Sequence, residues 1–420
     1  MTNYKVTGSV MLLAGFMSTA AQAEVVVEWW DFLGGGDGVR MKQLIEEFNA
    51  EHAGEISIQA TTLEWGVPFY TKVQTSVAVG EAPDIMTYHA SRIPLAVSQN
   101  VLSEITADDW ATMGLGEGDF ASATWDAVTI DSAQYAVPLD THPIVLYYNK
   151  ELLSAAGVLT DDGVPMGMDS LEGFTETMRA LQSNGVKFPL GSVTADGNFM
   201  FRTIYSLVGQ QGGELITDGE FLTGDNAEKL ANALAVLQDW TNEGLQSTYT
   251  DYPATVALFT SGEAAMMING VWEVPTMTDL NAAGNLFEWG AVELPMIFDQ
   301  RATYADSHSF AIPAGDMDPE TRAATLEVMS WMLKNSLFWA TAGHIPAYAP
   351  VTATAEYAAM EPNATYSPLT ANMIFDPKSP LAGVAGPIFD VMSTYFVPTL
   401  NGEMDPTEAV EEIIIELNDM

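Results

Sequence analysis

The sequence contains no cysteine. Disulfides, thiolate nucleophiles, zinc fingers and Cys-ligated iron–sulfur clusters are therefore excluded. The chain must be held together by packing alone. With 420 residues, 48% of them hydrophobic, it is long enough to do so and to form roughly two or three domains of ~100–200 residues each.

Basic residues are scarce: 14 Lys and Arg stand against 56 Asp and Glu, a formal net charge of −42. This balance excludes a nucleic-acid binder that works by neutralising phosphates, and it argues against docking on anionic lipid headgroups. Acidic chains are often disordered, but those are poor in aromatic residues. The 10 Trp, 14 Tyr and 18 Phe of this chain instead indicate a folded protein with a solvated acidic surface.

The common catalytic and nucleotide-binding motifs are absent. There is no Walker A loop, G-x-G-x-x-G, G-x-S-x-G or H-E-x-x-H pattern. The five histidines are scattered, and no two are three or four residues apart, so the spacing favours single exposed or satisfied histidines over a metal site. Carboxylate pairs for glycoside hydrolysis stay open, because 56 acidic residues make chance pairs inevitable.

The N-terminus has the pattern of a secretory signal peptide over residues 1–23. Lys5 supplies the positive charge, residues 10–17 form an apolar stretch too short to span a bilayer, and Ala21-Gln-Ala23 is a small-x-small cleavage site. No later stretch reaches ~18 uninterrupted apolar residues. We therefore expect cleavage after Ala23 and a soluble, exported mature chain, with a membrane anchor as the alternative.

Hydrophobic patterning predicts alternating strands and helices in the first part of the mature chain. Residues 25–30, 55–60 and 84–88 are expected to be strands, with helices after the first two of them. Such alternation predicts an α/β layer with a mainly parallel sheet. Further on, strands are predicted at 134–139 and 143–148, separated by Asp140-Thr-His142.

The later part of the chain is predicted to be mostly helical, with a few more strands. The predicted helices are 150–156, 170–183, 199–208, 226–242 and 318–335, with a final helix that begins near Asp405. The predicted strands are 263–268, 289–294 and 309–313.

Aromatic and polar residues gather where these predicted strands end. In open α/β sheets, ligands lie beyond the carboxyl ends of the strands. An indole offers a flat apolar face to a sugar ring, and carboxylates or imidazoles can bond its hydroxyls. We expect Trp29 to be core, since strand neighbours face opposite ways, and for Trp30, Trp65 and Trp272 both ligand contact and core packing stay open. The polar candidates are Asp31, His89, Asp140, His142 and Asp306.

Several segments, in order along the chain, resemble the family 1 extracellular solute-binding proteins, the maltose-binding-protein-like carbohydrate receptors of ABC importers. Gly80-Glu-Ala-Pro-Asp-Ile85 is similar to the family's G-x-x-P-D-[IV] signature, and Gly262 to Gly270 followed by Trp272 is similar to its G-x-x-A-M-x-x-x-G segment with a sugar-stacking tryptophan. Further similarity lies in Trp29-Trp-Asp31, Val137-Pro-Leu-Asp-Thr-His-Pro143, Leu146-Tyr-Tyr-Asn149 and Gly343-His-Ile-Pro-Ala-Tyr348.

The resemblance implies a two-lobed periplasmic binding protein fold of type II, an α/β architecture with the ligand between the lobes. We expect one lobe at 24–138 plus 296–338 and the other at 139–295 plus 339–420. The ligand-binding residues that it implies, together with the strand-end candidates, are Trp30, Asp31, Trp65, His89, Asp140, His142, Trp272, Asp306, His344 and Tyr348.

The function that the resemblance implies is capture of a mono- or oligosaccharide and its delivery to a membrane permease. It implies no enzyme activity, no catalytic residues, no metal and no cofactor, and a monomer free in a periplasm because no lipid-anchoring cysteine is present. A secreted glycoside hydrolase that uses a carboxylate pair is the alternative.

Overall fold

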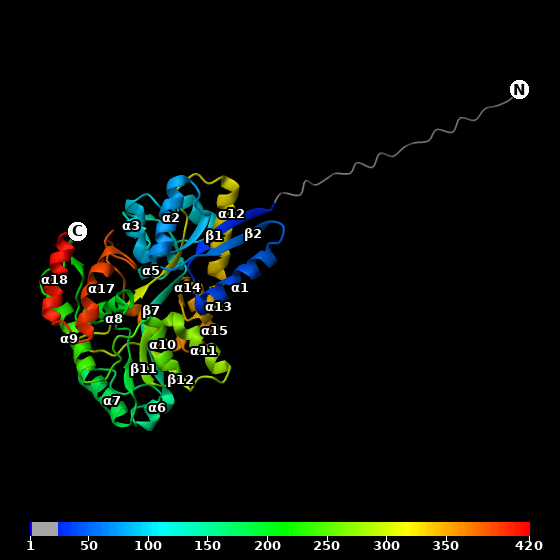
Figure 1. Ribbon diagram of the computed structural model, residues 1–420. Helices are drawn as coiled ribbons and strands as arrows, with labels where there is room; N and C mark the ends of the chain where they lie inside the picture. Colours follow the sequence, from blue (N-terminus) through cyan, green and yellow to red (C-terminus); the bar gives the residue numbers. More distant parts are fainter. Residues whose placement is uncertain (2–23, 218) are drawn as a thin grey trace.

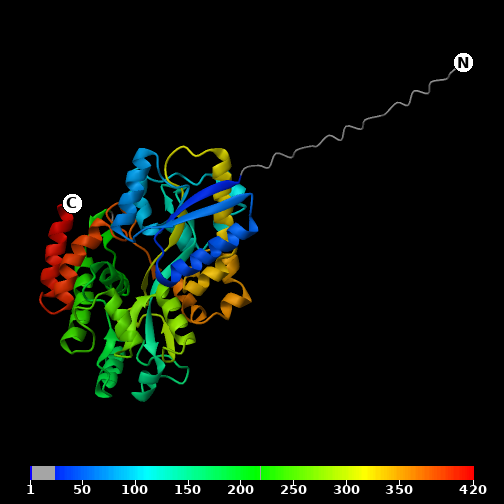
Figure 2. The same ribbon diagram turned by 45° about the vertical axis from the view of Figure 1, so that its right-hand side comes forward.

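The computed structural model describes residues 1, 24–217 and 219–420. Two halves are visible, one built mainly around the first strands and the other around the middle and C-terminal parts of the chain (Figures 1 and 2). The predicted signal peptide lies, except for Met1, outside the described residues. Among the described residues, no helix has the length and apolar character needed to cross a membrane.

The first half contains a five-stranded sheet. Its order is β2 (Ile56–Thr62), β1 (Val25–Asp31), β3 (Ile85–His89), β14 (His308–Ala311) and β6 (Val137–Pro138). Strands β2, β1 and β3 are parallel, as the βα alternation predicts, whereas β14 is antiparallel to β3 and β6. The helices of this half are α1 (Gly35–Glu51), α2 (Val67–Val79), α3 (Ile93–Ser98), α4 (Ala107–Met113), α5 (Ser122–Ala127), α12 (Pro319–Lys334) and α13 (Ser336–Trp339).

The second half contains a seven-stranded sheet centred on β7 (Asp140–Asn149). Its strands run β16 (Met373–Ile374), β13 (Thr303–Asp306), β7, β11 (Ala264–Gly270) and β8 (Phe188–Gly191), and β12 (Trp289–Val292) and β15 (Ile345–Pro346) also pair with β7. All four partners of β7 are antiparallel to it. The mainly parallel arrangement predicted for the first part of the chain does not extend to this half.

Helices cover the second sheet, and the C-terminal pair α17 (Pro387–Leu400) and α18 (Pro406–Asn418) contacts α8 (Gly197–Gly209) and α9 (Asn226–Asn242) (Figure 1). The other helices are α6 (Lys150–Ala155), α7 (Leu171–Ser183), α10 (Tyr252–Thr260), α11 (Val274–Ala282), α14 (Ala349–Thr352), α15 (Ala355–Ala358) and α16 (Asn363–Tyr366). Two short hairpins complete the fold, β4 (Thr129–Ile130) with β5 (Ala133–Gln134), and β9 (Ile216–Thr217) with β10 (Glu220–Phe221).

The chain changes sheets at points that matter for the site. Pro138 belongs to the first sheet and Asp140 to the second, and the return passes from Asp306 to His308. The sequence predicted a break at residues 140–142, but these residues form the start of the continuous, fully buried strand β7. Pairing of Asp140 with Pro346 and of His142 with Asp306 makes this polar segment a strand.

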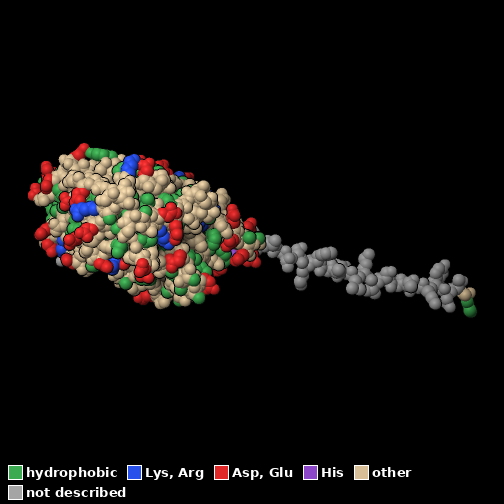
Figure 3. All heavy atoms as spheres, turned by 90° about the horizontal axis from the view of Figure 1, so that it is seen from below, with side chains coloured by type: hydrophobic (Ala, Val, Ile, Leu, Met, Phe, Trp, Pro, Cys, Tyr) green, Lys and Arg blue, Asp and Glu red, His purple; other side chains and the backbone are tan. Residues whose placement is uncertain are grey.

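Each sheet has its own hydrophobic core. Trp29 is fully buried in the first, where its indole N–H donates to Thr87 Oγ1 and its ring meets the edge of Phe310, so the expectation that it is core is confirmed. Carboxylates are spread over the face seen in Figure 3, with few Lys or Arg among them. The predicted lobe boundaries stay a prediction.

Candidate functional site

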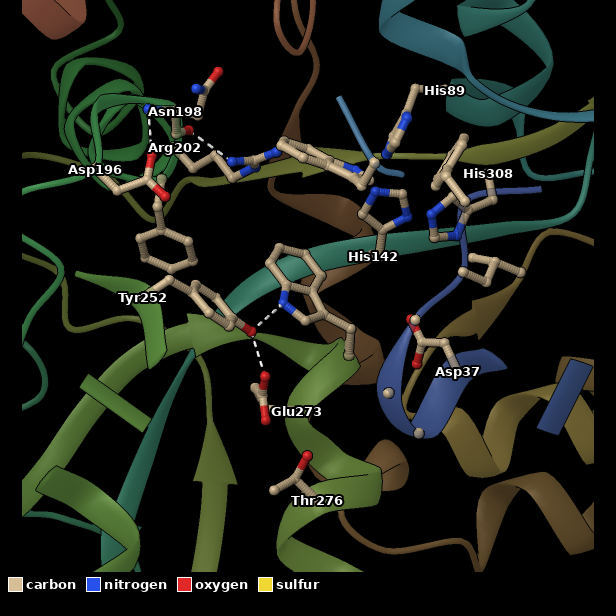
Figure 4. A pocket seen from close by; sticks show the side chains of 18 residues that line it. Asp37, His89, His142, Asp196, Asn198, Arg202, Tyr252, Glu273, Thr276 and His308 are labelled. Carbon is tan, nitrogen blue, oxygen red and sulfur yellow. Dashed lines mark hydrogen bonds between the residues drawn. The ribbon is translucent and has the colours of Figure 1, made fainter. Parts of the chain in front are cut away.

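A cavity of about 510 Å³ lies between the two sheets, within the range of small-molecule binding sites. Both halves of the molecule contribute to it. The first half supplies the loop after β1 together with Trp65 and His89, the sheet-changing strands supply His142 and His308, and the second half supplies the remaining side chains (Figure 4). Its lining residues are Phe32, Leu33, Gly34, Gly35, Gly36, Asp37, Trp65, His89, His142, Asp196, Asn198, Phe199, Arg202, Tyr252, Trp272, Glu273, Thr276 and His308.

The glycine-rich start of α1 forms one wall and touches the opposite half. A Cβ added at Gly36 would lie 2.2 Å from Cβ of Pro275 in α11, so only glycine permits this approach. Nearby, Arg40 Nη2 lies 3.1 Å from Asp279 Oδ1, also in α11. Helices from the two halves are therefore in contact beside the cavity.

The opposite wall is organised around Trp272, which lies just after β11. A Cβ at Gly270 would overlap the indole, so the ring lies directly on the backbone of Gly270. The indole N–H donates to the Tyr252 hydroxyl at 2.8 Å, and that hydroxyl in turn donates to Glu273 Oε1. Burial raises the pKa of the Glu273 carboxyl and outweighs its hydrogen bond from Tyr252. The indole is thereby fixed in plane and position.

Among the described residues that line the cavity, one is an arginine, Arg202 on α8. Its Nη1 donates to the carbonyl of Asn198 at 2.6 Å, and Cζ lies 5.9 Å from the Trp65 ring and 5.8 Å from the Trp272 ring. Asp196 caps the same helix by accepting from the Asn198 amide. Charge and aromatic surface thus alternate along this wall.

Three imidazoles, His89, His142 and His308, form the third side of the cavity (Figure 4). Beneath them lies the fully buried carboxylate of Asp140, with Oδ1 3.0 Å from His142 Nδ1 and Oδ2 2.9 Å from His308 Nδ1. Burial lowers the pKa of His142 to about 3 and that of His89 well below its ordinary value. His142 is therefore neutral, and its contact with the carboxylate places the proton on Nδ1.

The Asp140 carboxylate also accepts from the His308 amide and from the Trp339 indole N–H, at 3.0 and 2.7 Å. Burial by itself would raise the pKa of Asp140, but the neighbouring imidazoles of His308 and His344 outweigh burial and lower it well below its ordinary value. Asp140 is thus an anion whose oxygens are occupied by protein donors.

Four of the residues predicted for the site line this cavity: Trp65, His89, His142 and Trp272. Two others lie behind its imidazole wall, since Asp140 and His344 are both fully buried next to His142 and His308. Asp140 was predicted to bond ligand hydroxyls directly, whereas here it contacts the lining histidines.

The other predicted residues have structural partners outside the lining. Lys72 Nζ lies over the Trp30 ring, 5.2 Å from its centre. The Asp31 carboxylate accepts hydrogen bonds from the Leu33 amide and from Thr62 Oγ1. Asp306 accepts from the Ser91 and Ser307 amides and from Ser91 Oγ. The Tyr348 ring meets the edge of Phe120.

Sequence reasoning missed much of the second wall. Asp196 and Tyr252 belong to segments whose approach to Trp272 depends on tertiary contacts, and nothing in their local pattern marks them. Arg202 had a usable signal, since it is one of only 14 basic residues and lies in an otherwise uncharged helix. The clustering of four histidines is the clearest departure from the expectation of isolated ones.

Residues 43–368 match the family of bacterial extracellular solute-binding proteins. The chain belongs to this family. This membership makes the chain an extracellular solute-binding protein and agrees with the resemblance seen in the motifs.

Among curated relatives, the maltodextrin-binding protein MdxE of Bacillus subtilis is 23% identical over 277 residues, 64% of this chain and 61% of that protein. The galactooligosaccharide-binding protein of Bacillus subtilis is 23% identical over 303 residues, 67% of this chain and 62% of that protein. The match with this chain thus spans about six-tenths of each relative's own length.

Among solved structures, the GacH receptor of Streptomyces glaucescens, known unliganded and with acarbose, has a TM-score of 0.81 at 20% identity and covers 95% of this chain and 98% of that chain. Maltose-bound MalE3 of T. maritima has a TM-score of 0.78 at 20% identity, covering 94% and 99%. These likenesses confirm the predicted two-lobed binding-protein fold.

Proposed function

We propose that this chain captures a carbohydrate, a mono- or oligosaccharide, in the cavity between its lobes and delivers it to the permease of an ABC importer. The chain acts as a monomer in the periplasm and uses no cofactor. The maltodextrin- and galactooligosaccharide-binding relatives support the solute class. The proposal rests chiefly on the cavity itself.

The observation that carries the proposal is the pairing of a fixed indole with imidazole acceptors. Trp272 offers a flat apolar face held by Gly270 and Tyr252, and such a face suits the C–H side of a sugar ring. His142 directs Nδ1 at Asp140, which leaves its Nε2 as an unprotonated acceptor, and His308 Nδ1 lies at the other oxygen of the same carboxylate. A ligand with an apolar face and neighbouring hydroxyl donors can stack on the indole and donate hydrogen bonds to the imidazole wall.

Binding is coupled to closure through residues from both lobes. Trp65 and His89 come from the first lobe, and Trp272, Tyr252 and Arg202 from the second, so a ligand gains its full set of contacts only when the lobes are together. The contact of Gly36 with Pro275 and the Arg40–Asp279 ion pair belong to this closed arrangement.

A calorimetric titration of the purified chain against neutral mono- and oligosaccharides, including maltodextrins and galactooligosaccharides, tests the proposal. We expect saturable binding with about one ligand per chain and no loss of saccharide on prolonged incubation. Turnover would instead favour the glycoside hydrolase alternative, and failure to bind any saccharide would contradict the carbohydrate assignment.

A further inference from the structure

Three of the five histidines of this chain meet at one place, around one buried aspartate. Asp140 and His142 lie in β7, His308 begins β14, and His344 directly precedes β15. Their exposed fractions are 0%, 4%, 5% and 0%. One ligand atom from each of the four residues can be chosen so that all lie within 4.8 Å of one another.

The spacing of these atoms resembles a coordination shell. Asp140 Oδ1 lies 3.0 Å from His142 Nδ1, and Asp140 Oδ2 lies 2.9 Å from His308 Nδ1 and 3.4 Å from His344 Nδ1. A tetrahedral ion with bonds of ~2.0–2.1 Å separates neighbouring ligand atoms by roughly 3.3 Å. Imidazole nitrogens with one carboxylate oxygen are a ligand set that suits Zn²⁺ and other divalent first-row metals.

His344 supplies a second, independent observation. Although its ring is fully buried, neither ring nitrogen makes a hydrogen bond with any described residue, and Asp37 Oδ1 beside it is likewise unsatisfied. The nitrogens lie 3.4 Å from Asp140 Oδ2 and 3.2 Å from Asp37 Oδ2 without hydrogen-bond geometry. Buried polar atoms are nearly always partnered, and an ion is one of the recognised explanations for an exception.

The surroundings hold the candidate ligands in place and supply negative charge. The Trp339 ring stacks on His344 with centres 4.7 Å apart, and its N–H donates to Asp140 Oδ2 at 2.7 Å. Asn363 Nδ2 donates to the carbonyl of His344 at 3.3 Å. Partners that orient metal ligands in this way are a regular part of metal sites. Asp37 and Asp140 together bring two carboxylates to a dication.

We propose that Asp140, His142, His308 and His344 bind one divalent first-row transition-metal ion, with Zn²⁺ as the representative, behind the imidazole wall of the cavity. These ligands are far apart along the chain, so their spacing does not predict a metal site. The ion would join three segments that pass between the sheets, at Asp140–His142, at His308 and at His344, and so stiffen a hinge that has no disulfide. Coordination would displace the proton that His142 Nδ1 holds toward Asp140 and leave the ring proton on Nε2, so the acceptor role of His142 belongs to the metal-free chain. The metal proposal does not depend on the identity of the solute.

The test uses the full chain made without a polyhistidine tag, stripped with a chelator and dialysed against Zn²⁺ in the presence of excess Mg²⁺, which occupies surface carboxylates. Elemental analysis should find about one Zn²⁺ per chain, and Zn²⁺ should raise the melting temperature by mass action. His344→Gln should weaken Zn²⁺ binding by at least about tenfold. His52→Gln is the matched control, because His52 lies outside the proposed ligand set and away from the cavity, and it should bind Zn²⁺ as the parent does.

Absence of stoichiometric Zn²⁺ in the parent chain would overturn the proposal, as would equal loss of Zn²⁺ in both variants. If circular dichroism shows that His344→Gln does not fold, a Co²⁺ titration of the parent chain tests the site instead. A visible absorption band of a low-coordinate cobalt site supports the cluster, and the spectrum of hexaaqua Co²⁺ contradicts it. None of these measurements involves a saccharide, so they test the metal site independently of the proposed transport function.

Discussion

The hydroxyl of Tyr252 accepts a 2.8 Å hydrogen bond from the indole N–H of Trp272. The same hydroxyl donates to Glu273, so a chain of hydrogen bonds links the indole to a buried carboxyl. Burial raises the pKa of Tyr252 well above its ordinary value, and the nearby Glu273 carboxylate raises it further. The phenol therefore stays protonated and keeps both bonds, and the orientation of the indole depends on a residue 20 positions away.

Trp272→Ala should weaken saccharide binding by about 5- to 150-fold, taking ~1–3 kcal/mol for stacking on an aromatic ring by analogy with base stacking. The fold should be retained, because the side chain is partly exposed to the cavity rather than central to the core. Calorimetry measures the affinity and circular dichroism the fold. Unchanged affinity would mean that the ligand does not use this indole.

Tyr252→Phe should weaken binding by roughly fivefold to tenfold, since it removes one hydrogen bond worth about 1 kcal/mol from Trp272. Tyr249→Phe is the matched control, because Tyr249 also donates to a glutamate, Glu403, but is 56% exposed and remote from the lining. In a Trp272→Ala background the Tyr252→Phe effect should largely vanish. Additive effects would show that Tyr252 acts independently of the indole.

Asp140→Asn should weaken saccharide binding by roughly tenfold or more, as expected for loss of a charge-assisted hydrogen bond of ~1.5–3 kcal/mol. The cause is indirect, because Asp140 is fully buried and fixes the imidazoles of His142 and His308. Measured on metal-free protein, the variant should also change the tautomer populations seen by nitrogen NMR of these rings. Weaker binding with unchanged tautomers would instead favour direct contact between Asp140 and the ligand.

Gly36→Ala should impair closure of the lobes, because its Cβ would lie 2.2 Å from Cβ of Pro275. We expect saturating ligand to reduce the radius of gyration of the parent and to do so less in the variant, with a matching loss of affinity. Gly118→Ala is the control, since a Cβ there meets no atom within 4 Å. Small-angle scattering measures the change in radius of gyration of both variants. An identical change in the two would show that the contact of Gly36 with Pro275 is not part of closure.

Asp376→Asn should stabilise the protein at alkaline pH. Burial, with Asp306 adding to it, raises the pKa of Asp376 to about 7, and its Oδ1 has no hydrogen-bond partner among the described residues. Between its ordinary pKa near 4 and pH 7 the folded carboxyl holds a proton that the unfolded one has lost. Stability therefore falls as pH rises through this window and stays low above it.

The gain from Asp376→Asn should be on the order of 2–4 kcal/mol above pH 7 and should shrink toward zero near pH 4. Thermal unfolding at pH 5 and pH 8 measures it. Asp161→Asn, at an exposed loop position, provides the control for removing one negative charge. A pH-independent difference between the two variants would contradict the raised pKa.

Most local elements, and the family, could be predicted from the amino-acid sequence alone. Helix 226–242 was predicted with its observed bounds, and the first three strands were predicted to within two residues at each end. These elements are encoded by hydrophobic period, caps and glycine stops, which act over a few residues. Trp65, His89, His142 and Trp272 could be selected in the same way, because each follows or begins a recognisable strand.

The partners of these residues, in contrast, depend on contacts between segments that are distant in the sequence. Register places His308 opposite His89 and Asp306 opposite His142, which gathers histidines that are scattered along the chain. The same pairing turned Asp140-Thr-His142 from an expected loop into buried strand and moved Asp140 behind the cavity instead of into it. The physical reason is that strand pairing and burial depend on segments far apart in sequence. Helix caps and hydrophobic periodicity are local patterns, and they do not specify which distant segment an element will pack against.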